Sequence, residues 1–183
     1  MAVDYIGTYF TDDGFDFGGL LNADFFQPVR ILFQAGHYVS ATKLLVVAMD
    51  SVAHIEYGDV PGSFAKWLNT YAHLDSLEIT AEELWEQRNS LLHMSNLDSR
   101  KVRAGKVRSL VTYVGDLPPD VQLDQSVTGY YDLRRLILEF GYACERWIRT
   151  YDEDRSKIDC FIERYDLIAS DARMLHIPVS QGR

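Results

Sequence analysis

Apolar residues recur at helical spacing through the first third of the chain, after a lead-in without such a pattern. Residues 1–21 are acidic and rich in turn-forming glycine, so we expect an irregular segment there. A first helix is predicted from Asn22, a residue suited to capping, to about Ala35, and Gly36 fits its end. A second helix is predicted over residues 40–57 and is apolar nearly all round, which places it at the centre of the fold.

Two more helices are predicted in the middle of the chain. The third is indicated by apolar residues at helical spacing, namely Phe64, Trp67, Leu68 and Tyr71. The fourth has a clear beginning, because Thr80 and Glu83 match the capping-box pattern. Ile79 and Leu84 match the hydrophobic staple that accompanies such a box. The stretch EELWEQRNSLLHMSN, residues 82–96, is therefore predicted to be helical.

The second half of the chain combines a strand with two closing helices. Residues 107–114, VRSLVTYV, are rich in β-branched residues and predict a short strand or hairpin. Amphipathic helices are predicted over residues 130–151 and 155–175, and residues 176–183 form a tail. The whole pattern predicts one all-α domain over residues 1–183, a bundle of about five to six helices.

Composition agrees with a single compact domain. The chain has 183 residues, and 47% of them are hydrophobic, which is enough to bury a core. Its net charge of −9 argues against nucleic acid wrapped over the whole surface, although a local basic site is compatible with it. The longest apolar run, residues 44–49, is too short to span a bilayer, and no signal-peptide pattern is visible. We therefore expect a cytoplasmic protein that is not associated with a membrane.

The two cysteines do not indicate a metal or disulfide framework. Cys144 and Cys160 are far apart and form no CxxC pair. No other cluster of metal-ligand residue types is convincing, so we expect neither a metal nor a cofactor.

An arginine interrupts the apolar face of the fourth helix. On a helical wheel with about 100° per residue, Arg88 falls between Leu84 and Trp85. A guanidinium in that position needs a carboxylate, a phosphate or a water-filled cleft. The central helix offers two acids on different sides, Asp50 and Glu56, and the sequence does not choose between them.

Two further polar residues follow the arginine. Asn89 and His93 are four residues apart and share the next edge of the helix. Arginine suits phosphate binding, and histidine exchanges protons near neutral pH. In an ideal helix Arg88 and His93 lie about 140° apart, so a two-fold dimer would be needed to bring such groups to one phosphate. The structural alternative is an internal ion pair of Arg88 beside an ordinary histidine.

The residues RNSLLH, Arg88–His93, resemble the R-x(4–6)-H motif of HEPN (higher eukaryote and prokaryote nucleotide-binding) domains. In that motif a polar residue, often Asn, follows the arginine. Upstream, residues 31–52 resemble the first helix pair of the family. Residues 36–38 match its Gly-x-Tyr, and Asp50 matches the acid near the middle of its second helix. The two matches together span roughly residues 22–96.

The resemblance implies an all-α bundle that forms a homodimer, with two motifs facing one cleft. Many members are metal-independent ribonucleases of toxin–antitoxin, abortive-infection or CRISPR-linked defence systems. By this resemblance the RNA 2′-hydroxyl attacks the adjacent phosphate and leaves a 2′,3′-cyclic phosphate. His93 would act as acid or base, Arg88 would stabilise the phosphorane, and Asn89 would orient one of them. Other members are non-catalytic and bind a nucleotide or a partner protein, which is the alternative expectation.

A cluster of basic residues follows the motif. Its members are Arg100, Lys101, Arg103, Lys106 and Arg108. They are the candidates for an RNA-binding rim that attracts phosphate, and a solvated loop is the alternative. The remaining histidines belong to no matching constellation and receive no role: His37, His54, His73 and His176.

Overall fold

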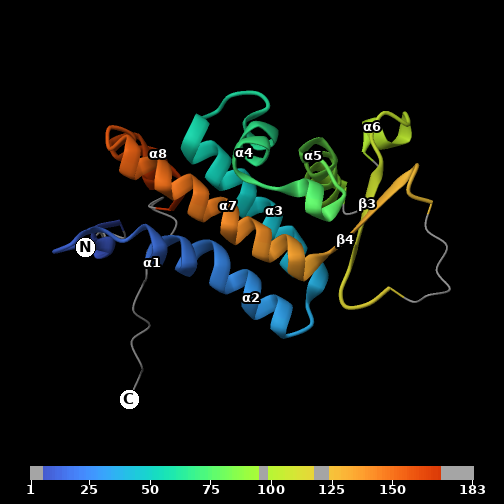
Figure 1. The fold of residues 1–183 in the computed structure, drawn as a ribbon, viewed down its shortest axis with the longest axis horizontal. Coiled ribbons are helices and arrows are strands. Elements are labelled where there is room, and N and C mark those ends of the chain that lie inside the picture. Colours follow the sequence, from blue (N-terminus) through green and yellow to red (C-terminus); the bar gives the residue numbers. More distant parts are fainter. Residues whose placement is uncertain (1–5, 95–98, 118–123, 170–183) are drawn as a thin grey trace, which may run out of the picture.

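The computed structural model describes residues 6–94, 99–117 and 124–169. This part of the chain is largely helical, with a small two-stranded sheet at each end of the molecule (Figure 1). The prediction of a mostly helical fold is confirmed. The two small sheets make the fold largely α rather than all-α.

The segment before Asn22 forms defined elements, contrary to the predicted irregular lead-in. It contains η1 (Ile6–Tyr9), β1 (Phe10–Thr11), β2 (Gly14–Phe15) and α1 (Phe17–Leu21). The carboxylate of Asp16 caps α1 by accepting a hydrogen bond from the N–H of Gly19 at 2.8 Å. Leu20 and Leu21 are buried almost completely, so their transfer from water draws this segment into the bundle.

The first predicted helix continues from α1 through a π-helix, η2 (Asn22–Phe26), into α2 (Gln27–Gln34). Asn22 has helical backbone angles and lies inside this helical segment, so its predicted capping role is wrong. Asp16 is an equally good capping residue, and it starts the helix six residues earlier. The predicted end is confirmed, because Gly36 takes a positive φ of 77° directly after the last turn.

Helix α3 (Tyr38–Tyr57) is the centre of the bundle, as predicted. It contacts α2, α4 (Ser63–Tyr71), α5 (Ala81–Asn89), α7 (Leu133–Glu153) and α8 (Lys157–Ala169). Figure 1 shows α3 running behind α7 through the middle of the molecule. Of the described helices, α3 alone is long and apolar enough to cross a membrane, but half of its apolar window is buried by protein. That burial is typical of the core helix of a soluble protein, so the structure is compatible with one.

The start of α5 confirms the predicted capping box. The Thr80 hydroxyl accepts from the N–H of Glu83 at 3.2 Å, and the Glu83 carboxylate accepts from the N–H of Thr80 at 2.7 Å. Ile79 and Leu84, the predicted staple, are both buried. The helical stretch continues as a π-helix, η4 (Ser90–Met94), and the residues immediately after it lie outside the described part.

A parallel two-stranded sheet lies at the end of the molecule opposite the N-terminal hairpin (Figure 1). The strand predicted over residues 107–114 is confirmed as β3 (Ser109–Tyr113). It pairs in parallel with β4 (Thr128–Asp132), which the hydrophobic pattern does not predict. A short helix, α6 (Arg100–Arg103), precedes the sheet and is likewise absent from the predicted elements.

The three residues before Leu133 belong to β4, although the apolar spacing predicts that they begin a helix. Helix α7 begins at Leu133, and the Asp132 carboxylate caps it by accepting from the N–H of Arg135 at 2.8 Å. Tyr131 explains the difference. It is buried, and its hydroxyl donates to the Gln87 side chain on α5 at 2.7 Å. A contact with another helix thus holds this segment extended, and local spacing does not reveal it.

The last predicted helix, over residues 155–175, is confirmed for the part that is described, as α8; residues 170–175 lie outside that part. Arg164 fixes α8 to the end of α3. Its guanidinium donates to the carbonyls of Ile55 and Glu56 at 2.8 and 2.6 Å. These carbonyls have no partner within their own helix end, so Arg164 satisfies acceptors that α3 leaves open.

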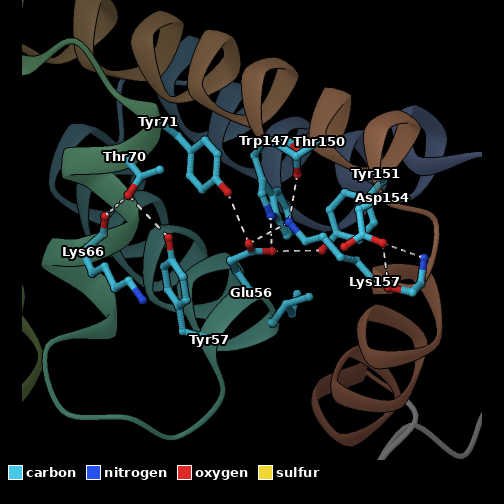
Figure 2. A network of polar contacts seen from close by, with 12 residues as sticks. Glu56, Tyr57, Lys66, Thr70, Tyr71, Trp147, Thr150, Tyr151, Asp154 and Lys157 are labelled. Carbon is cyan, nitrogen blue, oxygen red and sulfur yellow. Dashed lines mark hydrogen bonds and ion pairs between the residues drawn. The ribbon is translucent and has the colours of Figure 1, made fainter.

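Glu56 is the second attachment point of α8 (Figure 2). Its carboxylate accepts from Lys157 Nζ at 2.7 Å and from Trp147 Nε1 at 2.8 Å. The hydroxyls of Tyr71 and Tyr151 each donate to it at 3.2 Å. One buried carboxylate therefore joins the end of α3 to α4, α7 and α8.

The pKa of Glu56 reflects this environment. Burial by itself raises that pKa, but hydrogen bonds from Lys157 and Trp147, together with the charge of Lys157, outweigh burial and leave the pKa below its ordinary value. A lowered pKa in the folded state stabilises the fold at pH values above the pKa of an unfolded glutamate, about 4.3. This contribution is lost as the pH falls through the lowered folded-state pKa.

Replacing Glu56 with glutamine should therefore reduce stability in a pH-dependent way. At pH 7 we expect the free energy of unfolding to fall by roughly 1–3 kcal/mol, because Lys157 loses its charged acceptor. The difference between Glu56→Gln and the wild type should be full at pH 7 and shrink below about pH 4. Urea unfolding at several pH values measures it, with Glu163→Gln on the exposed side of α8 as the control. An equal deficit at pH 7 and pH 3 would contradict the role given to the Glu56 carboxylate.

Candidate functional site

Arg88 pairs with Asp50 on the central helix. Arg88 Nη2 lies 2.5 Å from Asp50 Oδ2, and the two side chains are 19% and 31% exposed. Glu56 lies six residues further along α3 and faces the separate network with Lys157. The structure thus decides between the two candidate acids, because six helical residues turn Glu56 to another side of α3.

Two other side chains hold the guanidinium of Arg88. Its Nη1 donates to the Asn89 side-chain oxygen at 3.0 Å, so Asn89 orients the arginine directly. The guanidinium carbon also lies 5.1 Å from the centre of the Trp85 ring, a distance at which the ring attracts a cation. Phe64 packs against Trp85 from α4, with ring centres 5.4 Å apart. The position of the charge is therefore fixed from three sides.

Arg88 still has unused donors. A guanidinium has five N–H groups, and the contacts with Asp50 and Asn89 engage one on each terminal nitrogen. The Nε atom is buried and has no hydrogen-bond partner within the described part of the chain. Buried polar atoms are normally satisfied, so Nε is an exception among the described residues, together with Trp67 Nε1 and Ser90 Oγ.

The arginine lies in the wall of an open cleft of about 610 Å³. Helix α3 contributes Asp50, Ser51 and His54 to the lining, and α5 contributes Trp85 and Arg88. The connection from α3 to α4, residues 58–62, closes one side, together with Ser63 and Phe64 of α4, and Ile168 of α8 also lines the cleft. The cleft thus combines a fixed cation, an aromatic ring and an imidazole, which are groups that bind phosphates and bases.

The π-helix η4 changes the geometry between Arg88 and His93. A π turn closes an i→i+5 hydrogen bond where an α turn closes i→i+4, so each residue within it rotates by less than the 100° of an α-helix. Because His93 lies inside this π turn, its backbone is closer to Arg88 around the helix than the 140° of an ideal α-helix. The side chain of His93 lies outside the described residues.

Some residues of the predicted basic rim have ionic partners in the structure, and others do not. Lys101 lies 2.7 Å from Glu82 and 3.4 Å from Glu86, so its charge is compensated by α5. Arg108 is likewise engaged by Glu83, at 2.5 Å. Three members are exposed and have no ionic partner in the described part of the chain: Arg100, Arg103 and Lys106. None of the basic cluster is among the described residues that line the Arg88 cleft.

Two cleft residues are absent from the predicted site, Trp85 and His54. Trp85 precedes Arg88 by three residues and His54 follows Asp50 by four, so each lies one helical turn from a predicted residue. This spacing could have identified both residues from the sequence. It points to a shared site, however, only once Arg88 and Asp50 are known to face each other. Among the described residues, no three His, Cys, Asp or Glu side chains are placed to hold a metal ion.

Comparison with protein-family models, with curated proteins and with solved structures finds no match to this chain. The functional interpretation therefore depends on the geometry of the cleft and on the resemblance of the motif.

A double-mutant cycle tests the pairing of Arg88 with Asp50. We expect Arg88→Ala and Asp50→Ala to be coupled by roughly 0.5–2 kcal/mol in the free energy of unfolding, because each removes the partner of a half-buried charge. Arg88→Ala and Glu56→Gln should instead be additive to within about 0.5 kcal/mol, because they act on separate networks. Chemical unfolding of the single and double variants gives both values. Coupling with Glu56 but not with Asp50 would contradict the observed pairing.

Proposed function

We propose that this protein is a metal-independent endoribonuclease of the HEPN type, with Arg88, Asn89 and His93 in its active site. The observation that carries the proposal is the guanidinium of Arg88, which is fixed by Asp50, Asn89 and Trp85 in the wall of an open cleft. A cation held in this way costs little to organise when negative charge develops next to it.

In the proposed reaction the RNA 2′-hydroxyl attacks the adjacent phosphorus and displaces the 5′-oxygen. His93 makes one of the two proton transfers, either taking the proton of the 2′-hydroxyl or giving one to the leaving oxygen, and water makes the other. Arg88 stabilises the charge on the phosphorane. Asn89 positions Arg88 through its 3.0 Å contact. The products are a 2′,3′-cyclic phosphate and a 5′-hydroxyl, so the chemistry requires no metal from the protein.

The π turn supports the participation of both motif residues. The π turn brings the backbone of His93 closer to Arg88 around the helix than an α turn would, which supports an action of both residues on one phosphate. π turns inside α-helices occur often at functional sites, where the widened turn redirects a side chain. The spacing of the motif, with four residues between Arg88 and His93, is thus compatible with both residues acting in one active site.

A non-catalytic HEPN module that binds a nucleotide or a partner protein is the second candidate. Asp50 favours the form that binds a partner protein, because the carboxylate compensates the charge of Arg88 and would repel an entering phosphate. The net charge of −9 acts in the same direction. In either role we propose a cytoplasmic toxin or defence component, with a cognate antitoxin or another protein as partner. The exposed Arg100, Arg103 and Lys106 would contact RNA outside the cleft.

The ribonuclease proposal predicts cleavage of RNA in the presence of EDTA. Purified wild-type protein should generate 2′,3′-cyclic phosphate ends, and His93→Ala should lower the rate at least about 100-fold, the usual contribution of a general acid or base. His73→Ala, at an exposed histidine of another region, is the matched control and should cleave normally. Arg88→Lys keeps the charge but not the planar donor array, so it should be nearly as inactive. A wild type that is as inert as His93→Ala would contradict catalysis and favour the binding module.

We also propose a homodimer with the Arg88 faces of two copies opposed. Val47 lies on α3 three residues before Asp50, and Leu92 lies four residues after Arg88. Both are exposed apolar side chains, at 38% and 36%, and each lies about one helical turn from a member of the ion pair. A second copy with two-fold symmetry would cover both apolar residues and bring the two clefts together.

Light scattering tests the dimer. The chain mass is 21.0 kDa, so a dimer should give about 42 kDa at micromolar concentration. Val47→Asp should shift the protein toward a monomer, because it places a charge in the proposed interface. Leu138→Asp on α7, an exposed apolar residue away from the cleft, should leave the mass unchanged. A wild-type monomer would contradict the shared cleft without affecting the fold.

A further inference from the structure

His54 is a histidine without an assigned role that lies in the Arg88 cleft. It follows Asp50 by four residues on α3, so the two side chains share one face of that helix. Both line the cleft together with Arg88 and Trp85. The imidazole of His54 is half-buried and makes no hydrogen bond or ion pair within the described part of the chain. Its two ring nitrogens are thus free to contact a ligand.

The other described histidines differ from His54. His37 and His73 are exposed, and neither is among the residues that line this cleft. The acids that could form a hydrogen bond or ion pair with the imidazole of His54 are Asp50 and Asp59, which also line the cleft. Asp50 is already held by Arg88 at 2.5 Å, and Asp59 is exposed without a recorded contact to His54. His54 therefore stands as a donor beside a fixed guanidinium.

We propose that His54 is a second phosphate contact of the cleft, donating to the same RNA phosphate as Arg88. The two donors come from different walls, His54 from α3 and Arg88 from α5, so a phosphate between them is held from two sides. A phosphate accepts several charge-assisted hydrogen bonds at once, so His54 and Arg88 can contact the same phosphate. This inference rests on the proposed function, because it takes the phosphate to belong to RNA.

Binding of an uncleavable RNA tests this contact without requiring turnover. The probe is a short 2′-O-methyl oligoribonucleotide with a fluorescent end, which keeps the phosphates but lacks the attacking hydroxyl. His54→Gln should weaken its binding roughly tenfold, the loss expected for one charge-assisted hydrogen bond. The matched control, His73→Gln, should bind as the wild type does. Fluorescence anisotropy gives the affinities, and circular dichroism verifies that each variant is folded.

Histidine ring signals provide a second measurement, made mainly on the wild-type protein. In wild-type protein the ring resonances of His54, assigned by their loss in His54→Gln, should shift when the oligonucleotide is added. They should shift much less in Arg88→Lys, because the phosphate would no longer be held beside His54. A nucleoside monophosphate is the comparison ligand. If it moves the same resonances with equal affinity, the occupant is a free nucleotide and the RNA assignment is overturned.

The outcomes separate this inference from the proposed function. Binding that is equal in wild type and His54→Gln, with unmoved His54 resonances, overturns the role of His54 and leaves the ribonuclease proposal intact. Binding that depends on His54 in a protein that cleaves no RNA supports the phosphate contact and rejects catalysis. A wild type that neither binds the oligonucleotide nor cleaves RNA overturns both.

Discussion

The central helix α3 brings two carboxylates into a largely apolar bundle, and each must be paired because an unpaired charge at such depth is costly. Glu56 accepts from Lys157 and Trp147 and thereby holds α8 and α7 against the end of α3. Asp50 pairs with Arg88 and joins α3 to α5. The Glu56–Lys157 pair serves the packing of the helices, whereas the Asp50–Arg88 pair lines an open cleft. For this reason only the second pair is a candidate functional site.

The Arg88 cleft lies where α3 and α5 pack together. Asp50 lies on the side of α3 that faces α5, and Arg88 of α5 supplies the cation that pairs with it. Trp85 and Asn89 then fix the guanidinium, and a π turn, η4, follows directly after α5. An ion pair that serves packing can also serve chemistry when water and ligands reach one side of it. The proposed ribonuclease function depends on that open side.

Local signals were sufficient wherever a helix has a marked end or a continuous apolar face. Thr80 and Glu83 predicted the start of α5 to the residue, because both halves of a capping box lie within one turn. Local signals failed where two residues were equally suited to cap a helix, and where a contact with a distant residue decides the structure. Asp16 rather than Asn22 begins the first helical segment, and Tyr131 is held in β4 by Gln87, 44 residues earlier.

The sequence by itself determined a mostly helical chain, a buried central helix and an arginine on an apolar face that needed a partner. These follow from spacing and composition, which act over a few residues. Only the tertiary structure decided that the partner of Arg88 is Asp50 and that Glu56 pairs with Lys157 of α8. It also decided that the charge of Lys101 is compensated by Glu82 and Glu86. It also brought His54 and Trp85 to the same cleft. Such pairings depend on how helices rotate against one another, which no local pattern specifies.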